Sequence, residues 1–201
     1  MNLEKTIENF RNNGYAVSYF DTAADAAAYI NKEIDGMTVS SGGSMTVNEM
    51  GLIDSLSKHN TYISHWNVPE GMTVEQALEK AMHTDVYLLS ANGASETGEL
   101  VNIDGTGNRI ASSFYGHKKV YFILGINKFE PDLESAIHRA RNIASPLNAK
   151  RLGKKTPCAV KGDKCYNCNS PERICNGMSI HFRKMSGCDE EIVIVGEKLG
   201  Y

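Results

Sequence analysis

Four cysteines in the last quarter of the chain have a spacing that suits a metal site. They follow the pattern Cys158-x6-Cys165-x2-Cys168-x6-Cys175. Four thiolates complete the tetrahedral shell of a structural zinc ion, and four cysteines also hold a [4Fe–4S] cluster. The sequence therefore predicts zinc or an iron–sulfur cluster here, with free thiols or redox disulfides as the alternative. Cys188 stands apart and is expected to be an ordinary buried residue.

A glycine pair, Gly42 and Gly43, stands between an expected strand and an expected helix. Glycine permits close approach of the backbone to a ligand, and Ser44 and Thr46 add hydroxyl donors. Together with Glu49, these residues are candidates for binding an anion where the helix begins. The alternative is a tight turn in which Thr46 and Glu49 form a capping box.

A carboxylate follows an expected buried strand at residues 86–90. Open α/β sheets bind ligands at the carboxyl ends of their strands, so Glu96 can serve there as a nucleophile or a general base. The neighbouring Thr97 and Gly98 are then ligand-binding candidates. The alternative is that Glu96 and Glu99 are solvated charges of a turn.

A second glycine-rich turn contains Gly105, Gly107, Asn108 and Arg109. Asp-Gly and Gly-Asn dipeptides favour turns, and an arginine can donate two parallel hydrogen bonds to a carboxylate or a phosphate. These four residues are therefore further candidates for ligand binding. The alternative is a surface turn with a solvated arginine.

The three polar turns follow strands of one expected sheet, so we expect them to meet in one crevice. Ser44, Glu96 and Arg109 would then face a shared pocket for a small, negatively charged molecule. If they lie on opposite sides of the molecule, no such pocket exists. The segment 66–69, which begins with Trp66, either lines this crevice or packs against the core.

The elements that must position these residues alternate along the chain. Strands are expected at residues 15–20, 37–40, 61–64, 86–90, 98–103 and 120–125, with helices between them, one of them from about 46 to 58. Such alternation predicts right-handed crossovers and a mainly parallel sheet with helices on both faces. We expect a single α/β domain over residues 1–201. Within it, residues 146–201 form a cysteine-rich loop and an edge-strand extension, in which 179–182 and 191–196 make an edge hairpin.

Composition narrows the class of protein. The chain has 201 residues, of which 41% are hydrophobic and 22% charged, which excludes a disordered, collagen-like or simple coiled-coil protein. A net charge of −3 argues against a general nucleic-acid binder. The amino-terminal residues lack the apolar core of a signal peptide, and no apolar run reaches the length of a membrane span. We therefore expect a cytoplasmic protein. The six histidines have no ligand spacing and are expected to be structural or exposed.

Taken in order, the motifs resemble a known family, the LUD domain of lactate-utilisation proteins. The resemblance is carried by Gly43-Ser44-Met45-Thr46 with Glu49 and Gly51-Leu52, by Glu96-Thr97-Gly98-Glu99-Leu100, by Gly107-Asn108-Arg109, by Lys118-Lys119-Val120 through Asn127-Lys128, and by Asn148-Ala149-Lys150-Arg151-Leu152. The cysteine tail is similar to that of a short subgroup of the family with its own cysteine motif.

The resemblance implies a fold like that of the NagB/RpiA/CoA-transferase group, a Rossmann-like three-layer sandwich with a short cysteine-containing extension. It implies a role in the oxidation of lactate or a related organic acid, with iron–sulfur partner subunits and an anionic substrate. A homo-oligomer is compatible with it. In this reading Glu96 lies near the reacting centre and Arg109 clamps a carboxylate or phosphate.

Two other functions remain open on the same residues. The turn Ser95-Glu96-Thr97-Gly98 looks like the glutamate turn of class I CoA transferases, with Thr97 where that turn has asparagine. This implies a CoA-transferase-like or sugar-phosphate-isomerase-like enzyme that uses Glu96 on a ligand containing CoA or phosphate. The other alternative is a non-catalytic subunit for ligand sensing or assembly, in which zinc stabilises the tail.

Overall fold

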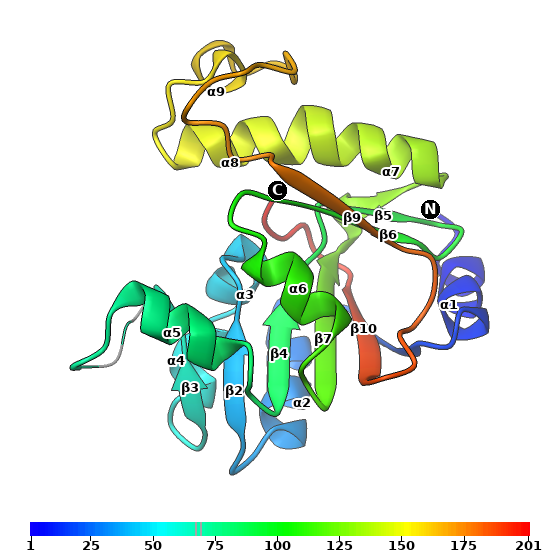
Figure 1. The fold of residues 1–201 in the computed structure, drawn as a ribbon. Helices are drawn as coiled ribbons and strands as arrows, with labels where there is room; N and C mark the ends of the chain where they lie inside the picture. The colour runs from blue at the N-terminus through cyan, green and yellow to red at the C-terminus, as the bar shows by residue number, and fades with distance from the viewer. Residues whose placement is uncertain (67, 69) are drawn as a thin grey trace.

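Six parallel strands form the central sheet of the computed structural model, which describes residues 1–66, 68 and 70–201 (Figure 1). In spatial order they are β1 (Ala16–Phe20), β10 (Asp189–Val195), β7 (Lys119–Gly125), β4 (Val86–Leu89), β2 (Thr38–Ser41) and β3 (Thr61–Ile63). Every neighbouring pair is parallel. The expected α/β fold with a mainly parallel sheet is therefore confirmed.

Helices cover both faces of this sheet, which makes a Rossmann-like three-layer sandwich. One face carries α2 (Ala23–Glu33), α3 (Met45–Glu49) and α4 (Leu52–Leu56), and the other carries α1 (Leu3–Asn12), α5 (Val74–Ala81) and α6 (Asn108–Phe114) (Figure 1). Ile30, Val47 and Leu56 belong to the core on the first face, and Phe10 to the core on the second.

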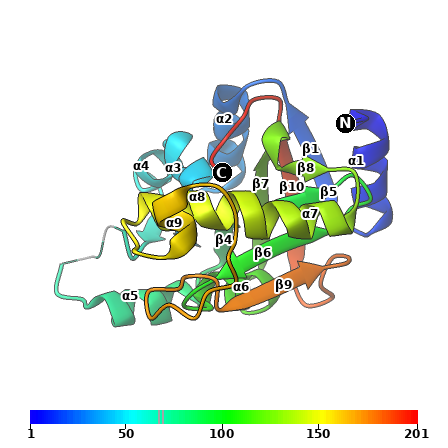
Figure 2. The same cartoon turned by 90° about the horizontal axis from the view of Figure 1, so that it is seen from above.

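A second, smaller sheet lies against the face that carries α1. Its order is β8 (Phe129–Glu130), β5 (Gly93–Ser95), β6 (Leu100–Asp104) and β9 (Gly177–His181), and a short 3-10 turn, η1 (Ile126–Lys128), leads into it from β7. A long helix made of α7 (Leu133–Arg139), a π-helical turn η2 (Ala140–Ala144) and α8 (Ser145–Arg151) packs on its outer face, and α9 (Pro157–Lys161) follows (Figure 2). Gly93 permits this packing, because a Cβ there would lie 2.4 Å from the Ala136 carbonyl oxygen.

Polar side chains cap the amino ends of several helices. Thr22 and Asp132 accept hydrogen bonds from Asp25 N–H and Ser135 N–H. Thr73 and Gln76 form a complete capping box. The single helix expected over residues 46–58 is instead two short helices, because Gly51 adopts a left-handed φ of 63° between them.

The expected edge hairpin at the end of the chain is wrong. β10 lies inside the central sheet between β1 and β7, while β9 is an edge strand of the small sheet. The run from Ile192 to Val195 is fully buried on both faces, and such a continuous apolar run suits an interior strand. Pro146 stands in the first turn of α8, and the helix continues past it to Arg151.

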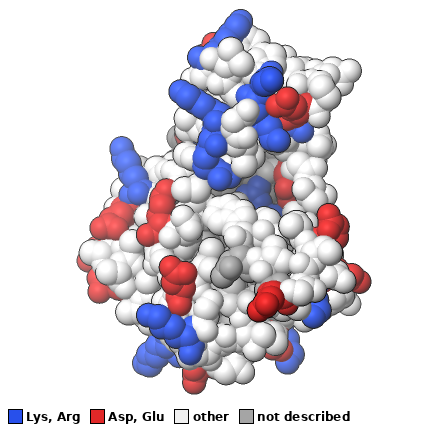
Figure 3. Space-filling model, turned by 90° about the vertical axis from the view of Figure 1, so that its left-hand side faces the viewer, with Lys and Arg blue, Asp and Glu red and all other residues white. Residues whose placement is uncertain are grey.

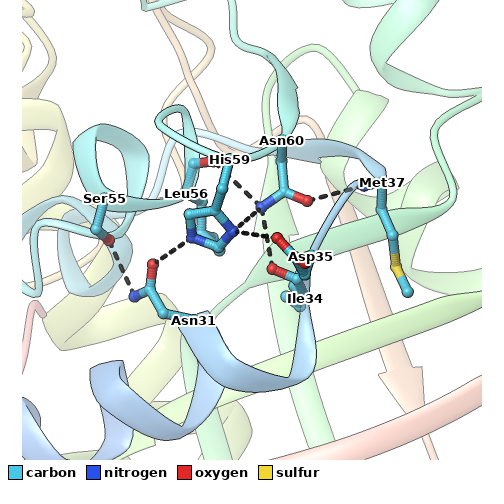
Figure 4. Close-up of polar contacts among 8 residues, drawn as sticks. All are labelled: Asn31, Ile34, Asp35, Met37, Ser55, Leu56, His59 and Asn60. Carbon is cyan, nitrogen blue, oxygen red and sulfur yellow. Dashed lines mark hydrogen bonds and ion pairs between the residues drawn. The ribbon is translucent and has the colours of Figure 1, made fainter.

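A network of polar side chains lies at the amino-terminal ends of β2 and β3 (Figure 4). The His59 ring lies 3.1 Å from Asp35 on one side and 3.1 Å from Asn31 on the other. Asn60 accepts a hydrogen bond from Met37 N–H at 2.9 Å, just before β2 begins. His59 thus has a structural role far from the carboxyl ends of the strands. In the ranges given above, no helix combines the length and apolar character that a membrane crossing requires.

Candidate functional site

Two connected cavities open at the carboxyl ends of β2 and β4. The outer chamber has a volume of about 210 Å³ and the inner chamber about 40 Å³. Gly43, Asn92, Arg109 and Asn148 line both chambers, which therefore form one cleft. A larger groove of about 740 Å³ lies beside α5, but it is lined by none of the site residues that the sequence predicted.

Arg109 lies between the two chambers and is held in place by its surroundings. Its Nη2 donates hydrogen bonds to Asn92 Oδ1 at 3.0 Å and to the Ile103 carbonyl oxygen. Gly42 makes room for it, because a Cβ on Gly42 would lie 2.9 Å from the Arg109 Cγ. Sequence reasoning therefore placed Arg109 correctly beside the glycine pair. Its guanidinium is positioned before any ligand binds, which is what a carboxylate clamp requires.

In the turn before Arg109, a carboxylate of the turn accepts hydrogen bonds from the free backbone N–H groups. Asp104 accepts hydrogen bonds from Arg109 N–H at 3.0 Å and Ile110 N–H at 3.2 Å. Gly107 begins α6 with a left-handed φ of 93°. The Asp104 carboxylate therefore already occupies the position at the first turn of α6 where an anionic ligand could bind. Gly105 and Asn108 line the outer chamber, as the sequence predicted, whereas Gly107 serves the turn itself.

An aromatic ring and a second arginine stand at the mouth of the outer chamber. The Arg151 guanidinium lies 5.6 Å from the centre of the Trp66 ring, and a Cβ on Gly43 would lie 3.2 Å from the same ring. Figure 3 shows Lys and Arg side chains above and within a hollow on this side of the molecule. Trp66 lines the outer chamber and is 39% exposed, so it does not pack inside the core. Asn67 and Pro69 lie outside the described residues.

Lys128, which the sequence analysis named only as the end of a family-like motif, also belongs to the cleft. It lines the inner chamber and is only 3% exposed. Burial is the main cause that lowers its pKa to about 7, and the charge of Arg139 lowers it further while Glu49 opposes the shift. The sequence offers two signals for it, since Lys128 closes one of the family-like motifs and follows the apolar strand β7 by three residues. A lysine that is close to neutral at physiological pH can bind an anion, transfer a proton or act as a nucleophile.

Ser44 and Thr46 line the inner chamber, and Glu49 contacts it only through Gly200, but all three side chains are already engaged. Ser44 Oγ accepts from Val47 N–H at 3.3 Å and so caps α3. Thr46 Oγ1 donates to the Leu199 carbonyl oxygen at 3.4 Å, and Glu49 accepts from Gly200 N–H at 2.7 Å. The capping box between Thr46 and Glu49 is therefore wrong. These two residues hold the segment 199–200 across the inner chamber instead.

Glu96 does not reach the cleft. Its carboxylate accepts a hydrogen bond from Asn2 N–H at 3.0 Å, at the first turn of α1, and its own carbonyl oxygen accepts from Asn9 at 2.7 Å. Thr97 donates to Glu99 at 2.6 Å, and Gly98 lies against Asn9. The expected meeting of the three turns thus holds for Ser44 and Arg109 but fails for Glu96, because the β5–β6 hairpin carries its tip away from the strand ends.

The four clustered cysteines line one small cavity next to the cleft. Cys165 Sγ accepts a hydrogen bond from Asn167 N–H at 3.3 Å, in a turn where Asn167 has a left-handed φ of 46°. Arg173 donates to the carbonyl oxygens of Cys168 and Cys175 at 2.8 and 3.0 Å. The loop is therefore folded around its thiols.

The thiols do not stand at ligand positions. Among the residues that the structure describes, no three His, Cys, Asp or Glu side chains are arranged to hold a metal ion, and all five cysteines are free. The donor set fits zinc or an iron–sulfur cluster in chemistry, but the thiols must close in to coordinate it. Cys188 lies elsewhere, buried in the core, as the sequence predicted.

A solved DUF162 family protein from Deinococcus radiodurans is similar with a TM-score of 0.55 and 11% identity, over 96% of this chain and 95% of that one. The eIF2B delta structure from Chaetomium thermophilum matches with a TM-score of 0.36 and 15% identity, over 69% of this chain and 58% of that one. None of the curated proteins compared with the sequence matches it. The family model described as LUD domain matches residues 3–195, so the chain belongs to the LUD-domain family.

Proposed function

We propose that this LUD-domain protein binds a small organic acid in the cleft and takes part in the oxidation or use of lactate or a related acid. The observation that carries the proposal is the position of Arg109, which faces both chambers and is fixed by Asn92. An immobilised guanidinium at the carboxyl ends of parallel strands is suited to a carboxylate. Membership of the family supports the wider role.

Oxidation of such an acid removes an electron pair, and partner subunits of the iron–sulfur type would accept it. The side chains of this cleft supply binding, orientation and a proton-transfer group rather than a nucleophilic carboxylate. Glu96 lies at the tip of the β5–β6 hairpin, so the cleft offers no support for a covalent CoA adduct at that residue.

Calorimetric titration of the protein with L-lactate and pyruvate tests this proposal. Arg109→Lys keeps the charge but loses the planar pair of donors, and Arg109→Met loses both. We expect affinity to fall about tenfold or more in Arg109→Met and by less in Arg109→Lys. The matched control is Arg183→Met, on an exposed residue. Equal affinity in all four proteins, or no binding by the wild type, contradicts the proposal.

We also propose that Cys158, Cys165, Cys168 and Cys175 bind zinc or a [4Fe–4S] cluster. Support comes from their shared cavity and from the backbone donors and Arg173 that order the loop. Bound zinc would cross-link the loop, whereas a cluster would carry single electrons.

Anaerobic purification followed by metal analysis and a visible spectrum separates these cases, since an iron–sulfur cluster absorbs visible light and zinc does not. Cys168→Ser should lose the metal, while Cys188→Ser should keep it, because Cys188 is buried in a different part of the molecule. If neither the wild type nor Cys188→Ser contains near-stoichiometric metal, the proposal is overturned.

A further inference from the structure

In the part of the chain that the structure describes, two polar groups of the inner chamber have no partner. Ser90 is 5% exposed, lines the chamber, and its buried hydroxyl has no hydrogen-bond partner. Within the described chain, none of the ion pairs involves Lys128, although it is 3% exposed. Buried donors without partners are costly, so their presence together in one cavity points to a ligand.

The charges around the chamber show which kind of ligand this is. Arg109 from α6 and Arg139 from α7 both act on Lys128, and Glu49 from α3 is the carboxylate that opposes them. Glu49 is itself engaged by Gly200 N–H at 2.7 Å. Arg139 is 3.9 Å from Glu130 and donates to backbone carbonyl oxygens. The chamber therefore has more buried positive than negative charge, which favours an anion.

The size of the chamber limits the anionic group. Its volume of about 40 Å³ has room for a few water-sized atoms, whereas the outer chamber of about 210 Å³ can hold the rest of a small molecule. A carboxylate head fits the inner chamber, and Tyr201, which lines it from the carboxy-terminal segment, narrows it further.

We propose that the inner chamber is the carboxylate subsite of the cleft, with Lys128 and Ser90 as its donors, and that Lys128 takes up a proton when the acid binds. This inference rests on the proposed function and names the part of the cleft that holds the carboxylate. Ser90 donates its hydroxyl hydrogen to one oxygen, and the Lys128 ammonium group donates to the carboxylate from the floor of the chamber.

The proton uptake follows from the protonation of Lys128 in the protein without ligand. Burial and the two arginines lower the pKa of Lys128 to about 7, so a large share of the protein holds a neutral amine at physiological pH. A bound carboxylate favours the charged form and raises this pKa. Binding therefore takes up little proton well below pH 7, and up to about one proton per ligand at pH values between 7 and the raised pKa. Affinity falls by up to about tenfold per pH unit on the alkaline side.

Calorimetry with L-lactate and pyruvate in buffers of different ionisation enthalpy measures this uptake directly. We expect proton uptake to rise with pH through about 7 in the wild type and to vanish in Lys128→Met, which should bind about tenfold or more weakly. Ser90→Ala should weaken binding but keep the proton uptake. Lys5→Met, on the exposed side of α1, is the matched control and should behave as the wild type. Thermal melts of each variant check that it is folded.

The outcomes separate the two proposals. Carboxylate binding that depends on Arg109 but is unchanged in folded Lys128→Met, without proton uptake, overturns this inference and leaves the proposed function standing. No carboxylate binding by the wild type overturns both. Inorganic phosphate is titrated in parallel, and tighter, Lys128-dependent binding of phosphate than of either acid overturns the assignment to a carboxylate.

Discussion

Arg109 and Asn92 are joined by a hydrogen bond of 3.0 Å from the guanidinium Nη2 to the side-chain Oδ1. The same Oδ1 accepts from Ile103 N–H at 2.8 Å, and the Asn92 carbonyl oxygen accepts from Arg139 at 2.5 Å. One asparagine after β4 thus links the start of the small sheet, the long outer helix and the arginine of the cleft.

Asn92→Ala should reduce both ligand affinity and stability. Arg109 loses the acceptor that orients it, so we expect affinity for L-lactate or pyruvate to fall about tenfold. The unpaired Ile103 N–H should lower the free energy of unfolding by about 1–3 kcal/mol. Asn31→Ala, in the network at the other end of the sheet, is the control, since it loses bonds to Ala27 and Ser55. It should lose stability in urea titrations but keep its affinity in calorimetry; equal losses of affinity in both variants contradict the role of Asn92.

The position of Glu96 leads to a second prediction. Glu96→Gln should leave ligand affinity in the cleft unchanged, because the carboxylate contacts Asn2 N–H and the first turn of α1 instead. The lost charge at the amino end of that helix should lower the free energy of unfolding by about 0.3–1 kcal/mol. Calorimetry and urea unfolding measure the two effects. If Glu96→Gln loses ligand binding, or loses an acyl-CoA turnover that the wild type shows, Glu96 is a reacting group after all.

The prediction that Glu96 lies in the cleft is wrong because alternating helices and strands do not reveal which sheet a strand joins. The sequence identified a turn after a strand, and the parallel sheet places such turns at one edge. However, β5 leaves that sheet and pairs antiparallel with β6, so the turn lies at the tip of this hairpin, against α1. β6 then returns the chain to the cleft at Asp104, which is why Arg109 was found correctly.

The burial of Lys128 could not be predicted from the sequence pattern for a different reason. A lone lysine after a strand is normally solvated, and its burial comes from packing of the outer helix and the segment 199–200 over it. In contrast, the helix caps at Thr22, Thr73 and Asp132 depend only on residues next to them in the sequence. Local features were therefore predictable, and sites built from distant contacts were not.

At the start of α3, the hydroxyl groups of Ser44 and Thr46 make different hydrogen bonds, and the sequence did not indicate which of the two caps the helix. Ser44→Ala should lower the free energy of unfolding by about 1 kcal/mol, since Ser44 Oγ caps Val47 N–H. Thr46→Val keeps the shape of the side chain and loses only a long bond of 3.4 Å to Leu199, so its effect should be smaller. Urea unfolding of both variants measures the difference. A larger loss in Thr46→Val would return the capping role to Thr46.

A buried histidine should make stability depend on pH. His181 is fully buried, stacks on Phe114 at 4.0 Å and lies 3.0 Å from Ser113 Oγ. Burial lowers its pKa from 6.5 to about 4, so the unfolded chain binds a proton between these values while the folded protein does not. Stability from this residue is therefore complete above pH 6.5 and is lost as the pH falls toward 4.

The loss amounts to about 3 kcal/mol in the wild type, at 1.4 kcal/mol per unit of pKa. His181→Phe replaces the ring with one that does not titrate and keeps a planar group against Phe114. We expect the free energy of unfolding of this variant to fall less than that of the wild type between pH 6.5 and 4. Other titrating groups contribute to both proteins, so urea unfolding at each pH is compared as a difference between the two. Parallel pH profiles would mean that His181 is protonated in the folded state, and that its buried contacts tolerate the charge.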